Sequence, residues 1–285
     1  MTKSGPLLTS LDDRVEIAPG VRMARLGLGT YKSAEGPDVE GEVSYGLHLG
    51  YRHIDTAALY GNERGVGRAL RASDVSRDDV TVATKVWNSD QGYVSTLKAF
   101  AASLERLGLD YVDVYLIHWP IPGLMRETWR AMEEIHESGR ARAIGVCNFL
   151  VHQLEELRAF ANVGPAIDQV EHHVRLQQPD LRDYCVEHGI TLQAWAPIMR
   201  GRVGEIGEIA EIASRHGKTP AQVSLRWILQ HGVTAIPKSV HHERVAENAG
   251  VFDFELSPEE MAALDGLDRG DRIGGHPDQF AMMGT

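Results

Sequence analysis

The chain has 285 residues, 43% of them hydrophobic and 24% charged, and a formal net charge of −11. These proportions are close to the averages for soluble globular domains, and nothing in them suggests disorder. The negative charge disfavours nucleic acids and anionic membranes as partners, although a local cluster of Lys and Arg can still hold a phosphorylated cofactor.

Short apolar runs alternate with longer stretches of helical periodicity from residue 26 onward. This alternation is typical of βα units that build a parallel sheet. Strands are predicted at residues 26–31, 51–56, 80–85, 112–118, 141–147, 166–170, 191–195 and 233–237. Helices are predicted between them, among others at residues 37–50, 62–73, 91–108, 125–139 and 177–189.

Further features flank these eight units. Residues 15–26 read as two short strands around Pro19-Gly20, which predicts a hairpin that caps one mouth of a barrel. Ser257 and Pro258, followed by acidic residues, have the pattern of a helix N-terminus. From Asp268 the chain is Gly-rich and irregular, and we expect this tail to be either a disordered end or a flap over the site.

The domain organisation follows from this count of units. Eight units with no break in composition favour a closed barrel over an open doubly wound sheet, because an open sheet usually needs a second lobe for the substrate. The length is also close to the roughly 250 residues typical of one barrel. We therefore predict an α/β fold in one domain, residues 1–285: a (β/α)8 TIM barrel with an N-terminal β-hairpin cap, an extra C-terminal helix and a tail.

The cysteines and the hydropathy of the chain indicate the cellular compartment in which the protein resides. Cys147 and Cys185 fall in apolar segments, which suits free thiols in a reducing environment. No stretch approaches the roughly 18 apolar residues of a membrane span, and the N-terminus lacks the apolar core of a signal peptide. We expect a cytoplasmic monomer with no membrane partner.

Four polar side chains lie at or just after the ends of consecutive predicted strands: Asp55, Tyr60, Lys85 and His118. In a (β/α)8 barrel the active site lies at the C-terminal ends of the strands. Each residue alone has an ordinary structural explanation, such as a helix cap or a buried histidine. Their joint placement predicts a catalytic site.

These four side chains suit the reduction of a carbonyl. Hydride delivery builds negative charge on the oxygen, and a positioned acid must neutralise it. Tyr60 can be that acid, because a nearby ammonium such as Lys85 lowers the tyrosine pKa from its usual value of about 10. Asp55 can keep Lys85 charged, and His118 can orient the carbonyl oxygen. This chemistry requires no metal.

Several longer segments resemble the aldo-keto reductases: GYRHIDTAALYGNERGVGRAL, TKVW, LIHWP, IGVCNF, QVEHH, and IPKSV followed by ERVAENAGVFDFELSPEEM. They occur in the family's order and spacing, from the hairpin to about Leu267. The resemblance implies a (β/α)8 barrel that uses NADPH to reduce an aldehyde or ketone, such as a keto-sugar or a small carbonyl. It places the family's catalytic tetrad on Asp55, Tyr60, Lys85 and His118. The short loops and the VFDFELSPEEM ending resemble bacterial members related to 2,5-diketo-D-gluconate reductases.

The resemblance also implies the residues around the nicotinamide. Asn148 and Gln169 would bind its carboxamide, and Trp195 would stack on its ring. Two departures affect this region: Cys147 stands where the family often has Ser, and residues 196–198 read Ala-Pro-Ile where it commonly has Ser-Pro-Leu. The second departure removes a hydroxyl near the pyrophosphate loop, for which main-chain amides could compensate.

The adenosine end of the cofactor falls on a basic segment. By resemblance, Lys238, Ser239 and Arg244 would hold the 2′-phosphate, and Glu247 and Asn248 would contact the adenine. The charges make independent sense, because a phosphate prefers Lys, Arg and hydroxyl donors.

Other residues have open or structural interpretations. Tyr31, Trp87 and Trp119 follow strand ends and could line an apolar substrate pocket, with a role as core aromatics equally open. Gly65-Val66-Gly67 begins like a dinucleotide fingerprint but lies inside a predicted helix, so we interpret it as structural. The two adjacent histidine pairs lack zinc-site spacing, and no metal site is predicted.

Two other functions stay open on the residues alone. Lys85 could form a Schiff base in an aldolase-like lyase. The segments HIDTAALYGNE and IPKS disfavour this, since a lyase has no need of a basic phosphate-binding cluster. The chain could also be a non-enzymatic NADPH-binding sensor, against which the intact tetrad counts.

Overall fold

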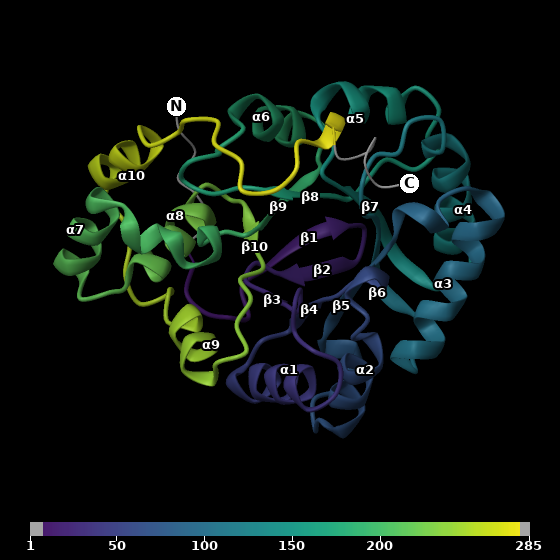
Figure 1. Cartoon of the computed structure of the whole chain (residues 1–285), viewed down its shortest axis with the longest axis horizontal. Coiled ribbons are helices and arrows are strands. Elements are labelled where there is room, and N and C mark those ends of the chain that lie inside the picture. Colours follow the sequence, from purple (N-terminus) through teal and green to yellow (C-terminus); the bar gives the residue numbers. More distant parts are fainter. Residues whose placement is uncertain (1–7, 280–285) are drawn as a thin grey trace.

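Figure 1 shows the computed structural model of the chain, which describes residues 8–279. Eight strands lie side by side in chain order, and all their pairings are parallel. They are β3 (Leu28–Gly29), β4 (His53–Asp55), β5 (Thr81–Val86), β6 (Val112–Ile117), β7 (Ala141–Cys147), β8 (Ile167–Glu171), β9 (Thr191–Trp195) and β10 (Thr234–Ala235). A parallel bridge between Leu26, just before β3, and Ala235 of β10 connects the two ends of the sheet, so the sheet closes. The predicted barrel is confirmed.

The contact between the segments of β3 and β10, which closes the barrel, is shorter than predicted. Single main-chain bonds from Gly27 to Ala235 and from Gly29 to Pro237, 2.8 and 3.1 Å long, take the place of a continuous ladder. A Cβ atom on Gly29 would lie 2.9 Å from the Ile236 carbonyl oxygen, so this close approach requires glycine. The prediction of full strands at residues 26–31 and 233–237 is therefore wrong in extent, because β3 and β10 keep only two residues each.

Ten α-helices of the described chain accompany the barrel: α1 (Pro37–Leu49), α2 (Glu63–Ala72), α3 (Tyr93–Leu107), α4 (Met125–Glu137), α5 (Val151–Arg158), α6 (Pro179–Glu187), α7 (Gly207–His216), α8 (Pro220–Gln230), α9 (His242–Ala249) and α10 (Pro258–Asp265). The five helices predicted by residue range correspond to α1, α2, α3, α4 and α6. The predicted start of α10 is confirmed, because Ser257 and Glu260 form a reciprocal capping box. Within residues 8–279, no helix is long and apolar enough to cross a membrane.

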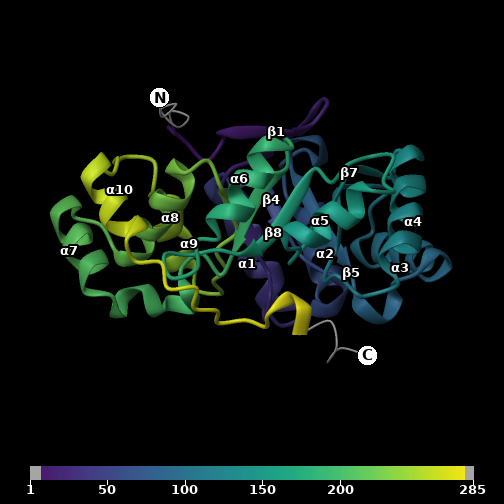
Figure 2. The same ribbon diagram turned by 90° about the horizontal axis from the view of Figure 1, so that it is seen from above.

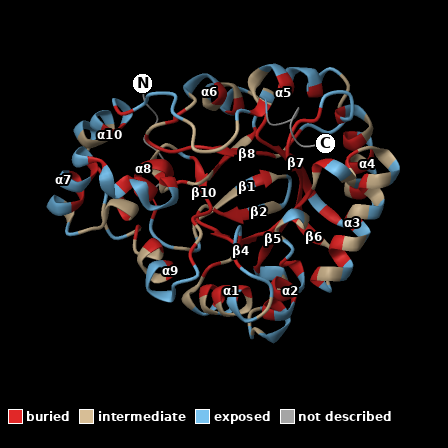
Figure 3. Ribbon diagram, in the orientation of Figure 1, coloured by how far each residue is buried: buried red, intermediate tan, exposed pale blue. Residues whose placement is uncertain are grey.

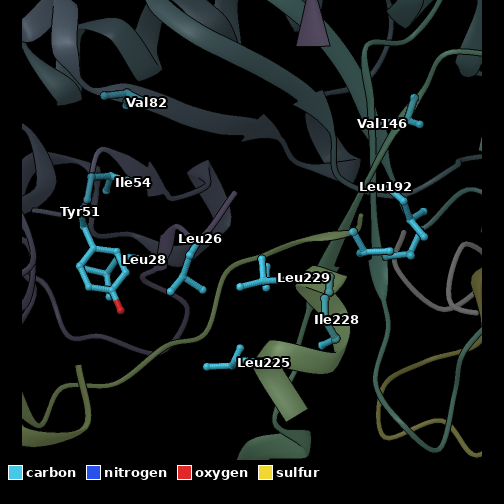
Figure 4. Close-up of a cluster of buried hydrophobic side chains, with 14 of the residues drawn as sticks. Leu26, Leu28, Tyr51, Ile54, Val82, Val146, Leu192, Leu225, Ile228 and Leu229 are labelled. Atoms are coloured by element: carbon cyan, nitrogen blue, oxygen red, sulfur yellow. The ribbon is translucent and has the colours of Figure 1, made fainter. Parts of the chain in front are cut away.

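The main core lies between the strands and the helices. Figure 3 shows the strands of the barrel mostly buried and the outer faces of the helices mostly exposed. In Figure 4, Leu225, Ile228 and Leu229 of α8 belong to one apolar cluster with residues of the strands such as Leu28 and Ile54. The spacing of these three residues places them on one face of α8, which explains why the helix packs against the barrel.

The predicted hairpin consists of β1 (Arg14–Ala18) and β2 (Val21–Ala24), which pair antiparallel. Its Ile17 and Met23 pack against apolar side chains inside the barrel, among them Val114 and Leu116. Figure 2 shows the hairpin at one end of the barrel and the C-terminal segment at the other. The hairpin closes the N-terminal end, and the C-terminal ends of the strands are left for the site.

Gly67 has a packing role, as the sequence indicates. It lies in α2, and a Cβ atom there would come within 1.9 Å of the Leu107 carbonyl oxygen at the end of α3. We expect Gly67→Ala to lower the free energy of unfolding by about 1–3 kcal/mol, because overpacking forces the two helices apart. Gly207→Ala is the matched control, since nothing lies within 4 Å of a Cβ atom at Gly207 in α7. Urea unfolding of both variants measures the effect, and equal stability would contradict it.

Candidate active site

The predicted catalytic side chains come from neighbouring strands. Asp55 is the last residue of β4, Lys85 lies near the end of β5, and His118 follows β6 directly. Tyr60 ends the short 3-10 helix η1 (Ala58–Tyr60), which comes after β4. Because alternate residues of a strand face the barrel interior, Asp55 and Lys85 meet there. The structure brings all four residues together at the C-terminal mouth.

Lys85 and Asp55 form a buried ion pair. The Lys85 Nζ lies 2.6 Å from Asp55 Oδ1, and the side chains are 0% and 2% exposed. Nζ also donates to the Thr56 carbonyl oxygen at 2.8 Å and to the Tyr60 hydroxyl at 3.4 Å. Burial opposes the charge, but Asp55 and Tyr60 outweigh it, so the pKa of Lys85 is raised. Lys85 is therefore an ammonium group held by three acceptors.

Tyr60 lies between this ammonium and two other rings. Its ring centroid is 5.0 Å from that of Tyr31 and 5.7 Å from that of His118. Burial raises the pKa of Tyr60, and Lys85 opposes this rise. The expected influence of Lys85 is present, but the expectation of a net lowered pKa is wrong for this structure, because loss of solvation is the larger effect. The phenol is protonated at neutral pH.

His118 is a neutral imidazole at this mouth. Burial and, to a smaller extent, the charge of Lys85 lower its pKa well below the usual range. Its Nδ1 is buried and has no hydrogen-bond partner among the described residues. The Trp87 ring meets it edge to face at 5.1 Å. A neutral ring can carry one N–H donor toward a carbonyl oxygen without adding a second positive charge beside Lys85.

Side chains that point into the barrel hold the Asp55–Lys85 ion pair by hydrogen bonds. Gln169 Nε2 donates to Asp55 Oδ2 and to Gln193 Oε1, both at 2.8 Å. Its Oε1 lies 3.9 Å from Cys147 Sγ. Both N–H donors of Gln169 are thus engaged. Gln169 could therefore bind the nicotinamide carboxamide only by accepting a hydrogen bond at its Oε1. Gln193 was not predicted as a site residue, although residues 193 and 195 alternate along β9 and therefore face the same side.

Asn148 and Trp195 lie beside His118. Asn148 Nδ2 donates to the His118 carbonyl oxygen at 2.9 Å, and its Oδ1 accepts from Trp195 Nε1 at 2.8 Å. Asn148 has a left-handed φ of 63°. Strained backbone of this kind is concentrated at functional sites. The two residues are placed together, and their nicotinamide roles stay predictions.

The loop after β9 also has an unusual backbone. Ala196, Met199 and Arg200 have φ values of 52°, 50° and 56°. Left-handed residues let successive main-chain N–H groups face one side, which is how backbone concavities bind anions. The family commonly has a Ser hydroxyl at position 196. The main-chain amides of this loop are suited to replace that hydroxyl as donors near the pyrophosphate.

The residues expected at the adenosine end follow β10. Lys238 is half-buried, Ser239 is 7% exposed, and Arg244 lies on the exposed face of α9. Neither Lys238 nor Arg244 forms an ion pair with a described residue, although the charge of Lys238 also acts on the buried Glu42. On the same helix, Asn248 is buried and Glu247 accepts a hydrogen bond from Thr219 at 2.6 Å, a contact that holds α9 against α8. This donor set fits a phosphorylated cofactor.

Two of the three aromatic residues predicted for the substrate pocket, Tyr31 and Trp87, contact the tetrad. Tyr31 is 46% exposed beside Tyr60, and Trp87 packs on His118. Trp119 is 7% exposed and forms a small apolar cluster with Ile121 and Trp87. Contact with substrate stays a prediction for all three, and the burial of Trp119 agrees as well with a role in packing.

The described part of the tail packs at the same mouth. The main-chain N–H groups of Ile273 and Gly274 donate to the Glu171 carboxylate at 2.6 and 3.0 Å. A Cβ atom on Gly274 would lie 2.4 Å from the Trp195 ring, so the tail rests directly on that ring. Of the two alternatives for the tail, residues 268–279 agree with the flap, and residues 280–285 lie outside the described chain. Glu171 was missed by sequence analysis because its partners are about 100 residues away.

The two adjacent histidines that follow β8 have different surroundings. His172 stacks on Trp227 at 5.5 Å, while His173 Nε2 lies 3.0 Å from a Glu171 oxygen. Burial lowers the pKa of His172 to about 3, so its ring is neutral. Among residues 8–279, no group of three or more His, Cys, Asp or Glu side chains is placed to hold a metal ion.

Comparison with known proteins agrees with this geometry. The model of the aldo/keto reductase family matches residues 25–269. Glyoxal reductase of Bacillus subtilis is 50% identical over 272 residues, which cover 95% of this chain and 99% of that protein. Methylglyoxal reductase DkgA of Escherichia coli is 41% identical over 93% of this chain and 97% of its own. A crystal structure of a Gox0644 mutant in complex with NADPH superposes with a TM-score of 0.87 at 41% identity, covering 93% of this chain and 97% of that one.

Proposed function

The chain belongs to the aldo/keto reductase family, and from this premise we propose that it reduces a small aldehyde or ketone to an alcohol with NADPH, with Tyr60 as the proton donor. The protein is an oxidoreductase, and the sequence-based expectation of NADP dependence agrees with the family and with the NADPH complex of a structural neighbour. The single observation that carries the catalytic proposal is the Asp55–Lys85–Tyr60 chain of contacts, which ends at the barrel mouth beside His118.

The residues present fit NADPH. Lys238, Ser239 and Arg244 would hold its 2′-phosphate, and Glu247 and Asn248 would contact the adenine. Lys238 and Arg244 form no ion pair with a described residue, and this supports a phosphate at this end of the site, because charge-assisted hydrogen bonds to phosphate are stronger than neutral ones. At the other end, Asn148 and Gln169 would hold the carboxamide and Trp195 would stack on the ring. When bound there, NADPH supplies the hydride.

The chain's own groups complete the reduction. Negative charge that develops on the carbonyl oxygen is neutralised by the proton of the Tyr60 hydroxyl. Lys85 stabilises the phenolate that remains, and Asp55 keeps the ammonium charged and in position. The neutral His118 ring orients the oxygen by a hydrogen bond. Tyr60 therefore donates the proton, Lys85 and Asp55 stabilise the phenolate that forms, and His118 orients the carbonyl oxygen.

The surroundings of Lys85 weigh against the lyase alternative. A Schiff-base lysine must be a neutral amine, and enzymes achieve this by lowering the lysine pKa. Here the pKa of Lys85 is raised, and Nζ is held by Asp55, Thr56 and Tyr60. Borohydride treatment in the presence of a carbonyl substrate tests this directly, and a covalent adduct on Lys85 would support the lyase.

Small dicarbonyls are the substrates we favour, because similar proteins are a glyoxal reductase and a methylglyoxal reductase. A screen of glyoxal, methylglyoxal, simple ketones and a keto-sugar, followed by loss of NADPH absorbance, tests the proposal. Turnover of the small aldehydes supports it. Tight NADPH binding with no turnover of any carbonyl would instead support the non-enzymatic sensor.

Arg244→Ala tests the phosphate end of the site. We expect NADPH binding to weaken by about 1.5–3 kcal/mol, the range for a charge-assisted hydrogen bond, with little change for NADH. Titration of cofactor fluorescence measures both dissociation constants. Arg22→Ala is the matched control, because Arg22 is exposed on the hairpin at the opposite end of the barrel. Equal weakening of both cofactors by Arg244→Ala would refute its role at the 2′-phosphate.

A further inference from the structure

A buried carboxyl group lies beside the basic segment that follows β10. Glu42, on α1, is 1% exposed. Its Oε2 accepts a hydrogen bond from the Ser33 hydroxyl, while its Oε1 is buried with no hydrogen-bond partner among the described residues. The charge of Lys238 and the main-chain N–H of Ser239 both favour its ionised form. These are two of the residues that we propose hold the 2′-phosphate.

The fold fixes this proximity. Gly29 at the end of β3 bonds to Pro237, so the loop that carries Ser33 runs against the segment that carries Lys238. On the other side, the Tyr51 hydroxyl donates to the Val245 carbonyl oxygen at 3.1 Å, which holds the chain after α1 against α9. Glu42 therefore faces the phosphate end of the site from a rigid helix, without being exposed on its surface.

Near neutral pH, both the neutral and the ionised form of Glu42 are populated. Burial raises its pKa to about 7, against the opposing effects of Ser33, Lys238 and Ser239. An ionised Glu42 competes for the charge of Lys238 and repels a phosphate dianion, whereas a neutral Glu42 does neither. The same carboxyl has no comparable effect on a cofactor that ends in a 2′-hydroxyl.

We propose that Glu42 is a specificity-determining residue of the cofactor site: its neutral form permits strong preference for a 2′-phosphorylated nicotinamide cofactor, and its ionised form weakens that preference. The inference rests on the proposed position of the 2′-phosphate. It predicts that the preference for NADPH over NADH decreases as the pH rises from 6 to 8, and that NADPH binding near neutral pH takes up a proton from solvent.

Other groups near α1 also carry charge and must be separated from Glu42. The His242 ring of α9 stacks on Tyr45 of α1 at 4.1 Å, and Arg244 lies on the same helix as His242. On the side of α2, Arg68 pairs with Glu40 and with Glu35. The 2′-phosphate itself titrates near pH 6, but its ionisation strengthens binding as the pH rises, opposite to the effect proposed for Glu42.

The test compares Glu42→Gln with the unaltered protein. Dissociation constants for NADPH and NADH are measured by fluorescence at several pH values between 6 and 8.5. Calorimetry in buffers of different ionisation enthalpy counts the protons taken up. In the unaltered protein we expect the affinity ratio of NADPH to NADH to fall by about 5- to 30-fold over this range, from the charge interactions of a half-buried site. In Glu42→Gln the ratio stays high and proton uptake is lost.

Glu40→Gln is the matched control, because Glu40 is a partly exposed carboxyl on the same helix and is paired with Arg68. It should follow the unaltered protein. Glu42→Met is a second variant without a carboxyl, for use if the amide disturbs folding. Identical pH curves in the unaltered protein and both Glu42 variants overturn the role of Glu42 alone. Equal binding of NADPH and NADH at every pH, with no effect of Arg244→Ala, overturns the phosphate site and this inference with it.

Discussion

Tyr60→Phe is expected to lose most of the turnover while NADPH binding stays nearly unchanged. The variant keeps the ring, and with it the packing against Tyr31 and His118, but removes the hydroxyl that lies 3.4 Å from Lys85 Nζ. General acid catalysis typically contributes about 10²- to 10⁴-fold, so kcat should fall by about that factor. The measurements are kcat with methylglyoxal and the dissociation constant of NADPH.

Tyr111→Phe is a suitable control for the loss of a phenol hydroxyl. Its hydroxyl bonds to Asp78 at 2.8 Å, and it lies just before β6 rather than at the mouth. We expect its turnover to stay close to that of the unaltered protein. If Tyr60→Phe also retains most of its turnover, Tyr60 is not the proton donor and the assignment of the tetrad fails.

The barrel and the position of the tetrad were predictable because the signals are local. Alternation of apolar runs with helical stretches needs only a short window of sequence, and strand ends follow from it. Once the strands are placed in a closed barrel, Asp55, Lys85 and His118 must share one mouth. The capping box at Ser257 is local in the same sense, since its two partners are three residues apart.

The features that were missed depend on contacts between distant segments. Glu42 meets residues almost 200 positions away, and Glu171 binds the tail about 100 positions away. No periodicity in the sequence indicates either contact. The pKa of Tyr60 was misjudged for a related reason: a neighbouring charge can be inferred from the sequence, but the depth of burial that outweighs it belongs to the packed structure.

The second large effect separates the roles of Lys85 and His118. Lys85→Met should reduce turnover by about 10²-fold or more at every accessible pH, because the phenolate of Tyr60 loses its stabilising charge. Since Lys85 lowers the pKa of Tyr60, any surviving activity should have its alkaline limb shifted to higher pH. The variant also leaves Asp55 buried and unpaired, which typically costs about 3–5 kcal/mol of stability.

A double variant distinguishes the catalytic loss from the folding defect. Asp55→Asn combined with Lys85→Met removes both charges, so we expect it to unfold at a higher urea concentration than Lys85→Met alone. Gln169 Nε2 can still donate to the amide oxygen at position 55, which keeps the polar layer satisfied. Turnover should remain low in the double variant. Recovery of turnover together with stability would mean that Lys85 only supports the fold.

His118→Ala should behave differently, because its imidazole is neutral and orients the substrate. We expect a loss of about tenfold with a small aldehyde, the size of one hydrogen bond, and a smaller loss with a keto-sugar that other pocket contacts can position. The pH profile should move little, since a ring whose pKa lies well below the usual range does not titrate near neutrality. Rates for both substrates from pH 5 to the highest pH at which the protein stays folded decide the matter, because burial places the alkaline limb of Tyr60 above pH 10. An alkaline shift in His118→Ala with none in Lys85→Met would reverse the two roles.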